Sequence, residues 1–209
     1  MDYTIKHVTT EQELDNALEF SRRIFGEHHT GLGSRESQKE GMLKHMERDN
    51  DLLLYAECNG EIMGMAFGSI GENGNMTVDT VAVDGRLQGC GIARKMIMML
   101  EERAITKGVF VIGLGAVQSA EGFYSKLGYI GSLLIQSEKH SIEELLSLNT
   151  AYPVNYTRVH DDTINQVNLA LTEPDRDLQR KYETTLPGCY TQMMFWKKLQ
   201  EVQDAPMGR

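Results

Sequence analysis

Apolar and polar residues follow one another along the first third of the chain with the two periods that distinguish helices from strands. After a strand-like stretch at residues 3–9, apolar residues recur at helical spacing over residues 11–25 and 38–48, which predicts two helices. Two strand-like runs follow, LLLYAEC and EIMGMAFGSI, with Asn59-Gly60 between them. Because an Asn-Gly pair favours the tight turns that join antiparallel strands, these runs predict a hairpin.

The middle of the chain alternates between strand-like and helix-like stretches. The run at residues 109–114 is continuously apolar, as in a strand buried on both faces. Alternation of this kind implies an α/β fold of the α+β type, with a mixed sheet covered by helices. The pattern predicts, in order, a strand at 76–83, a helix at 92–107, a strand at 109–114, a helix at 120–127 and a strand at 129–137.

A glycine-bearing turn joins the strand at 76–83 to the helix at 92–107. Such a turn offers unpaired backbone N–H groups and the positive end of a helix dipole, which together bind phosphate. A Walker loop is excluded, because no Lys followed by Ser or Thr comes after the last glycine. A dinucleotide-binding turn is also excluded, because Arg94 replaces its third glycine and the stretch VFVIGLG has no carboxylate for a ribose.

The turn contains QGCGIA at residues 88–93, and a later stretch reads AEGFYSKLGYIGS at residues 120–132. Both resemble motifs of the GNAT superfamily of acyl-CoA-dependent N-acetyltransferases. The family's pyrophosphate turn has Arg or Gln, two residues, Gly, one residue, then Gly or Ala, and its later signature has Ala, two residues, Phe-Tyr, three residues, Gly and an aromatic. The two matches lie at compatible spacing, and the resemblance covers residues 3 to about 137.

The resemblance implies a GNAT acyl-CoA N-acyltransferase fold that binds acetyl-CoA as the acyl donor. Backbone groups at the end of the strand would line the pantetheine arm, and the amides of the turn would wrap the pyrophosphate. Gln88 matches the first position of the pattern, and Gly91 permits close backbone approach. The cofactor-binding residues that the resemblance implies are Val81, Ala82, Val83, Gln88, Gly89, Cys90, Gly91, Ile92, Ala93 and Arg94.

Two residues are candidates for proton transfer. Tyr124 matches the tyrosine that protonates the departing CoA thiolate in many members of the family. The acceptor amine must also lose a proton before it attacks, because a primary ammonium has a pKa of about 10.4. Asp79 is the candidate for this step, since strand alternation puts it on the same face as Val81 and Val83. The alternative is an Asp that is hydrogen-bonded near the strand entrance or solvated.

The chain departs from the family pattern at two positions that bear on proton transfer. The family often has an Asn seven residues before the tyrosine, where this chain has Val117. Some members use a Glu near the end of the preceding strand, where this chain has VFVIGLG. These departures leave open a non-catalytic acyl-CoA-binding or protein-interaction module on the same fold. Transfer of an acyl group longer than acetyl is open as well.

Composition narrows the partners that the chain could have. A net charge of −9 disfavours nucleic acid and slightly favours a cationic acceptor, either a small metabolite or a peptide or protein amine. The three cysteines, Cys58, Cys90 and Cys189, lack metal-ligand spacing, so we expect neither a disulfide framework nor a metal site. No apolar run approaches a membrane span and the first residues do not resemble a secretory signal, so we expect no membrane partner and a cytoplasmic location.

About 70 residues follow the GNAT-like core, which we assign to residues 1–137. This is more than the closing strand hairpin of a plain GNAT domain. Residues 138–209 therefore form a predicted C-terminal α/β extension, with a helix, two strands, a second helix and a last strand at about 190–197. We expect that last strand to join the core sheet. The rest of the extension could cover the acceptor site, form a homodimer contact or enlarge the core.

Overall fold

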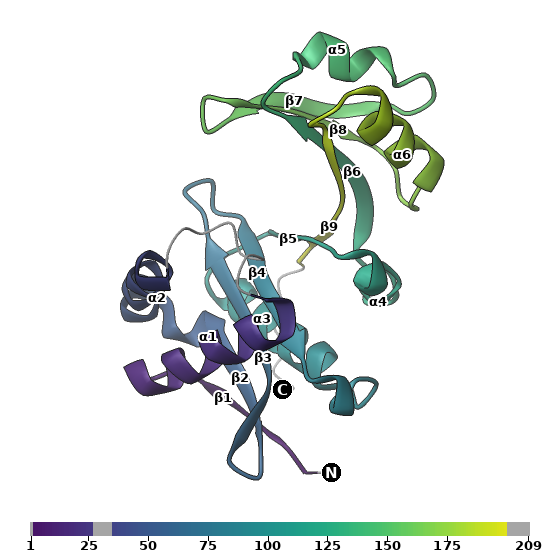
Figure 1. The fold of residues 1–209 in the computed structure, drawn as a ribbon. Coiled ribbons are helices and arrows are strands. Elements are labelled where there is room, and N and C mark those ends of the chain that lie inside the picture. The colour runs from purple at the N-terminus through teal and green to yellow at the C-terminus, as the bar shows by residue number, and fades with distance from the viewer. Residues whose placement is uncertain (1, 27–34, 200–209) are drawn as a thin grey trace, which may run out of the picture. The chain divides into compact units, whose positions relative to one another are not determined.

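The computed structural model describes residues 2–26 and 35–199. These residues form six α-helices and nine β-strands, with three short 3-10 turns. The described residues divide into two compact units (Figure 1), one made of residues 2–26, 35–112 and 198–199 and the other of residues 113–197. The predicted α/β class is confirmed, and every predicted helix and strand has a counterpart among the observed elements.

The first unit is a four-stranded antiparallel sheet with helices on both faces. Its strands lie in the order β1-β2-β3-β4. The elements of this unit are β1 (Thr4–His7), α1 (Glu11–Phe25), α2 (Arg35–Asp49), η1 (Asn50–Leu52), β2 (Leu53–Cys58), β3 (Glu61–Ile70), β4 (Met76–Val83), η2 (Gly85–Leu87) and α3 (Ile92–Thr106).

The hairpin between β2 and β3 forms as the Asn-Gly pair predicts. Asn59 and Gly60 have φ values of 53° and 79°. Positive φ at both central residues is the geometry of a type I′ turn, whose twist matches that of the two strands it joins. Because the turn is short, it fixes the register at the start of the hairpin, as far as an irregularity between Ala56 and Glu57.

Helix α1 begins at a capping box that also ties it to the sheet. The Thr10 hydroxyl accepts the Glu13 amide at 3.2 Å, and the Glu13 carboxylate accepts the Thr10 amide at 3.0 Å. The Tyr55 hydroxyl donates to the same carboxylate at 2.8 Å. These hydrogen bonds outweigh the effect of burial and hold the pKa of Glu13 at about 2. Glu13 therefore stays ionised at the start of the helix, where the helix dipole favours a negative charge.

The two faces of the sheet in the first unit pack against different helices. On one face, Leu14 and Phe20 of α1 pack with Met65 and Phe67 of β3 in a buried cluster. On the other face, Gly64 leaves room for α3, because a Cβ there would lie 3.1 Å from the Ile92 side chain. This packing fixes where α3 begins, and therefore where the turn that precedes it lies.

The second unit is also built on an antiparallel sheet, in the order β9-β6-β8-β7. Strand β5 (Val111–Gly115) crosses the boundary between the two units. The remaining elements are η3 (Gln118–Ala120), α4 (Glu121–Lys126), β6 (Ile130–Ser137), α5 (Ile142–Ser147), β7 (Val154–His160), β8 (Ile164–Leu169), α6 (Arg176–Thr185) and β9 (Tyr190–Lys198).

A buried tyrosine joins helix α5 to helix α6. Tyr182 of α6 is fully buried, and its hydroxyl donates to the Leu145 carbonyl of α5 at 2.8 Å. The strands β7 and β8 are joined by a tight turn at Asp161 and Asp162, both with positive φ. Residues 160–163, with the sequence HDDT, therefore form a polar hairpin turn. The strand predicted at 190–197 is present as β9, which pairs with β6.

The compact units do not follow the division predicted from the sequence. The unit boundary falls inside β5, after residue 112, whereas the sequence ends the GNAT-like core at about residue 137. Spatial compactness and family membership are different criteria, so the division at 137 stays a prediction. Residues 200–209 of the predicted extension lie outside the described residues. No helix in the described ranges is both long and apolar enough to cross a membrane.

The packing of α1 on the sheet should dominate the stability of the first unit. Leu14 is fully buried, so Leu14→Ala should lower the free energy of unfolding by about 2–5 kcal/mol through lost burial and a cavity. Ile24, on the same helix, is 37% exposed. Ile24→Ala is the matched control and should change stability by about 0.5 kcal/mol or less. Urea denaturation measures both, and equal losses would contradict this packing.

Candidate functional site

The glycine-bearing turn occupies residues 84–91, between β4 and α3. Gly89 and Gly91 both have a φ of +81°, in the region that L side chains rarely adopt. A Cβ added at either position would meet no atom within 4 Å. The backbone conformation therefore calls for these two glycines, and the space around them is open.

Helix α3 begins at this turn with amides that have no acceptor inside the helix. The first four N–H groups of an α-helix lie ahead of its hydrogen-bond ladder. Here the ladder starts with the Lys95 amide, which donates to the Gly91 carbonyl at 3.0 Å. Gly91 is the N-cap and has no side chain to accept from the first turn. The amides of Ile92, Ala93 and Arg94 thus lie at the positive end of the helix dipole, an arrangement that suits a phosphate.

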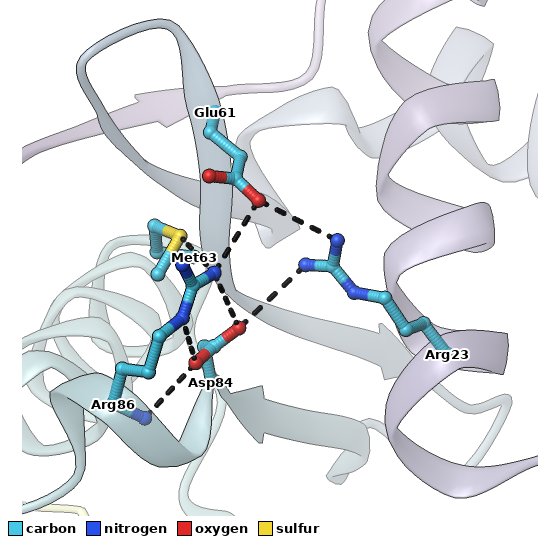
Figure 2. Close-up of polar contacts among 5 residues, drawn as sticks. All are labelled: Arg23, Glu61, Met63, Asp84 and Arg86. Carbon is cyan, nitrogen blue, oxygen red and sulfur yellow. Dashed lines mark hydrogen bonds and ion pairs between the residues drawn. The ribbon is translucent and has the colours of Figure 1, made fainter.

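A buried carboxylate stands at the entrance to the turn. Asp84 follows β4 directly, and its Oδ1 accepts from the amide and from Nε of Arg86, both at 2.9 Å. Its Oδ2 lies 3.7 Å from Arg23 at the end of α1. Figure 2 shows the two arginines facing Asp84 and Glu61, with Glu61 bridging between the guanidinium groups.

Asp79 lies at an irregularity in the ladder between β3 and β4. Phe67 pairs with Thr80, but Gly68 pairs with Val78, so β4 has one extra residue here. A bulge of this kind shifts the alternation of side chains by one position. The expectation that Asp79 shares the face of Val81 and Val83 is therefore wrong, because simple alternation does not hold across the bulge.

The environment of Asp79 favours its protonated form. Its Oδ1 accepts a hydrogen bond from the Ser69 hydroxyl at 3.0 Å. Surrounding protein raises the pKa of Asp79 to about 6, and the hydrogen bond from Ser69 acts in the opposite direction. The residue still has exposed surface, so water reaches the carboxyl and moderates its desolvation. A carboxyl of this kind changes its charge close to neutral pH.

Tyr124 lies in the aromatic core of the second unit. It is 6% exposed, and its ring packs against Tyr129 and Phe195 with centroid distances of 5.9 Å and 5.8 Å. Burial raises the pKa of Tyr124 to about 12. The phenol is therefore protonated at any working pH, and it can act as a hydrogen-bond donor.

The helix that carries Tyr124 is tied to the C-terminal part of the second unit. Glu121 at the start of α4 is 6% exposed and forms an ion pair with Arg176 of α6. Arg176 also donates to Gln179, at 2.6 Å. Because an ionised carboxylate is costly to bury alone, this pair holds α4 and α6 together.

The predicted site residues fall into two groups. Asp79, Val81–Val83 and the turn at 88–94 form one continuous stretch of the first unit, whereas Tyr124 belongs to the second unit. Asp84 was not predicted from the sequence, although an Asp two residues before its amide partner is a common turn signature. Nor was the pair of Glu121 with Arg176, which has no local signature because the partners are 55 residues apart.

The chain is similar to proteins of one described family. The family model described as "Acetyltransferase (GNAT) family" matches residues 15–129, which is more than half of the chain. An acetyltransferase of Pectobacterium atrosepticum is 35% identical over 105 residues, which cover 48% of this chain and 73% of that protein.

Solved structures show the same fold at low sequence identity. A GNAT-family acetyltransferase of Staphylococcus aureus Mu50 aligns with a TM-score of 0.56 and 14% identity, over 95% of this chain and all of that one. The PaiA N-acetyltransferase of Thermoplasma acidophilum, solved in complex with coenzyme A, aligns with a TM-score of 0.51 and 14% identity. That alignment covers 82% of this chain and 100% of the other.

Removing the partner of Glu121 should destabilise the second unit. Arg176→Ala leaves a buried carboxylate unpaired, and the partial exposure of Arg176 limits the expected cost to about 1–3 kcal/mol. Arg180, on the same helix, pairs with Asp177 in solvent, so Arg180→Ala should cost less than about 1 kcal/mol. Denaturation followed by circular dichroism compares the two, and equal losses would mean that the buried pair contributes nothing beyond an exposed one.

Proposed function

The chain belongs to the acetyltransferase (GNAT) family, and from this premise we propose that it transfers an acetyl group from acetyl-CoA to a primary amine. The amine attacks the thioester carbonyl directly in a ternary complex, the carbon–sulfur bond breaks, and CoA leaves as a thiolate. The observation that carries the proposal is the turn before α3, with its two left-handed glycines and its unpartnered first-turn amides. These features match what a pyrophosphate needs.

The donor side of the site is proposed to lie along β4 and the turn. The backbone of Val81, Ala82 and Val83 would bind the pantetheine arm. The amides from Gly89 to Arg94 would bind the pyrophosphate, except that of Cys90, which already donates to the Leu87 carbonyl. Val83 is the last residue of β4, so the two groups follow one another along the chain. Cys90 is exposed and unpaired, as suits a small residue of the turn.

We assign Tyr124 to the leaving group. With a pKa of about 12, the phenol is a weaker acid than a thiol, whose pKa is about 8.5. Complete proton transfer to the thiolate is therefore unfavourable, whereas a hydrogen bond to the developing negative charge on sulfur is favourable. Burial of Tyr124 among aromatic rings supports this role, because an electrostatic interaction is stronger where water is excluded.

We assign Asp79 to the acceptor side, as the group that receives a proton from the incoming ammonium. A pKa of about 6 leaves its carboxylate ionised at neutral pH. Transfer from an ammonium with a pKa of about 10.4 is uphill, and attack on the thioester carries it forward by consuming the free amine that forms. The negative charge would also favour a cationic acceptor. The net charge of −9 agrees with a small cationic metabolite, and a peptide or protein amine is a second candidate.

A non-catalytic acyl-CoA-binding or protein-interaction module is the competing function. It is favoured by Val117, which stands where the family often has an Asn and which is 45% exposed. Both functions predict CoA binding, but only the acetyltransferase predicts turnover of the thioester. We further propose that residues 1–137 form the acetyltransferase core and residues 138–209 its extension. We also propose that the extension forms a homodimer contact and that the protein is cytoplasmic.

The first test separates binding from turnover. Acetyl-CoA at 100 times its Kd should stabilise the fold by about 2.7 kcal/mol in a thermal-shift titration, while NADH should not. Thiol release is then screened with polyamines, amino acids, aminoglycosides and short peptides. Tyr124→Phe keeps the aromatic packing and should lower kcat by about 100-fold while CoA binding persists.

The matched control is Tyr182→Phe, the same chemical change at another buried tyrosine of the second unit. It removes the hydrogen bond to Leu145 and should lower stability without lowering kcat. Absence of any shift with acetyl-CoA would contradict the proposed function. CoA binding without thiol release from any acceptor would favour the non-catalytic module.

The second test uses the pH dependence of the reaction. Because Asp79 must be ionised to accept a proton, kcat/KM should fall as the pH drops through about 6. Asp79→Asn should be slow at every pH and should lack this acidic limb. Ser69→Ala removes a hydrogen bond that lowers the pKa of Asp79, so it should move the limb to higher pH. An unchanged limb in Asp79→Asn would exclude Asp79 as the base.

A further inference from the structure

We propose that Asp84 is a positioning residue that holds the phosphate turn in its binding conformation before the ligand arrives. This inference rests on the proposed function, because it concerns the turn that would receive the pyrophosphate of acetyl-CoA. Asp84 itself would not touch the ligand, since a carboxylate beside a pyrophosphate would repel it. It would act through Arg86 and the backbone of the turn.

The first support is the number of contacts that a single carboxylate makes. Oδ1 of Asp84 accepts from the Arg86 amide and from Arg86 Nε, and Oδ2 accepts from Arg86 Nη2 at 3.0 Å. The amide contact caps the short turn η2, and the other two contacts form a bidentate pair with the guanidinium. One side chain therefore fixes both the backbone and the side chain of the residue two positions further on.

The second support is a series of backbone hydrogen bonds that leads from the sheet into the turn. The Asp84 amide donates to the Met63 carbonyl of β3 at 2.9 Å, and the Leu87 amide donates to the Asp84 carbonyl at 2.9 Å. The Cys90 amide then donates to the Leu87 carbonyl at 3.3 Å. Asp84 is the first residue of the turn in this series, and its backbone is bonded both to β3 and to Leu87. A change in the conformation of Asp84 would therefore shift the residues of the turn that follow it.

The third support is the balance of charge around Asp84 (Figure 2). Two arginines, Arg23 and Arg86, face two acidic residues, Asp84 and Glu61. Hydrogen bonds from Arg86 lower the pKa of Asp84 to about 2, so the carboxylate is ionised at any working pH. Arg23 belongs to the last turn of α1, so the group also joins the end of that helix to the start of the turn.

If Asp84 holds the turn in place, the ligand need not order the turn when it binds. Fixing the backbone of a residue costs conformational entropy, and a turn that is already fixed spares the ligand that cost. The same pairing occupies the Arg86 guanidinium, which would then support the turn instead of binding phosphate. Loss of Asp84 should therefore weaken CoA binding, while the chemical step in the bound complex is little changed.

The experiment compares the wild type with Asp84→Ala and Asp84→Asn. Asp84→Asn keeps the side-chain shape and so provides a folded variant that lacks the charge. The Kd for CoA is measured by calorimetry, and amide hydrogen exchange over residues 88–94 is measured without ligand. Asp84→Ala should raise the Kd about tenfold, speed the exchange of the turn and raise the KM for acetyl-CoA with kcat within about twofold.

Asp49→Ala is the matched control. Asp49 is as shielded as Asp84, with 16% against 13% of its side chain exposed, and it also pairs with two cations. One of these, Lys107, is the C-cap of α3, at the opposite end of the helix from the turn. Asp49→Ala should lower the melting temperature to a similar extent without changing the Kd for CoA.

A double-mutant cycle tests the route through Arg86. If Asp84 acts through Arg86, Arg86→Ala should weaken CoA binding to a similar extent, and the double variant should be no worse than either single variant. Additive losses would instead mean that Arg86 binds the phosphate itself, which would overturn the inference.

The outcomes also separate this inference from the proposed function. A wild type that binds no CoA would contradict the proposed function and the inference together. A wild type that binds CoA, with an unchanged Kd in both Asp84 variants, would contradict the inference alone. A rise in Kd that Asp49→Ala reproduces would show a general loss of stability, and it too would overturn the role of Asp84.

Discussion

The site depends on one feature of backbone physics, namely that the first turn of an α-helix has N–H groups with no acceptor in the helix. At most helix starts a side chain accepts one of them, as Thr10 does for α1. At α3 the N-cap is Gly91, which has no such side chain and adopts a left-handed conformation. The strand before it, the two glycines and the packing of α3 on Gly64 all serve to present these amides at an open surface.

Asp79 and Asp84 lie five residues apart, and their different surroundings give the same type of side chain very different pKa values. Hydrogen bonds and charge from Arg86 hold the pKa of Asp84 at about 2, whereas desolvation by the surrounding protein raises the pKa of Asp79 to about 6 against the opposing hydrogen bond from Ser69. The first carries a permanent charge, which suits a structural pair. The second gains and loses a proton near neutral pH, which suits proton transfer. The surroundings of the two carboxyls, ion pairing for Asp84 and desolvation for Asp79, separate these properties.

The residues after the family motifs pack and pair with the elements that contain the second motif, including helix α4, which carries Tyr124. Glu121 comes from the motif and Arg176 from the predicted extension, and their buried ion pair joins α4 to α6. Strand β9 likewise pairs with β6, which follows the motif directly. Within the second unit, the residues after 137 are therefore part of the support for the motif helix.

Local patterns in the sequence determined the helices and strands, the Asn59-Gly60 hairpin and the turn with Gly89 and Gly91, because each depends on residues close together in the chain. The family motif is local for the same reason. Contacts between distant segments could not be predicted. The bulge at Asp79 depends on pairing with β3, the pair of Glu121 with Arg176 joins residues 55 positions apart, and Arg23 and Glu61 reach Asp84 and Arg86 only once α1 and β3 pack beside the turn. Tertiary structure decided these features, because desolvation and charge pairing depend on which atoms surround a group in space.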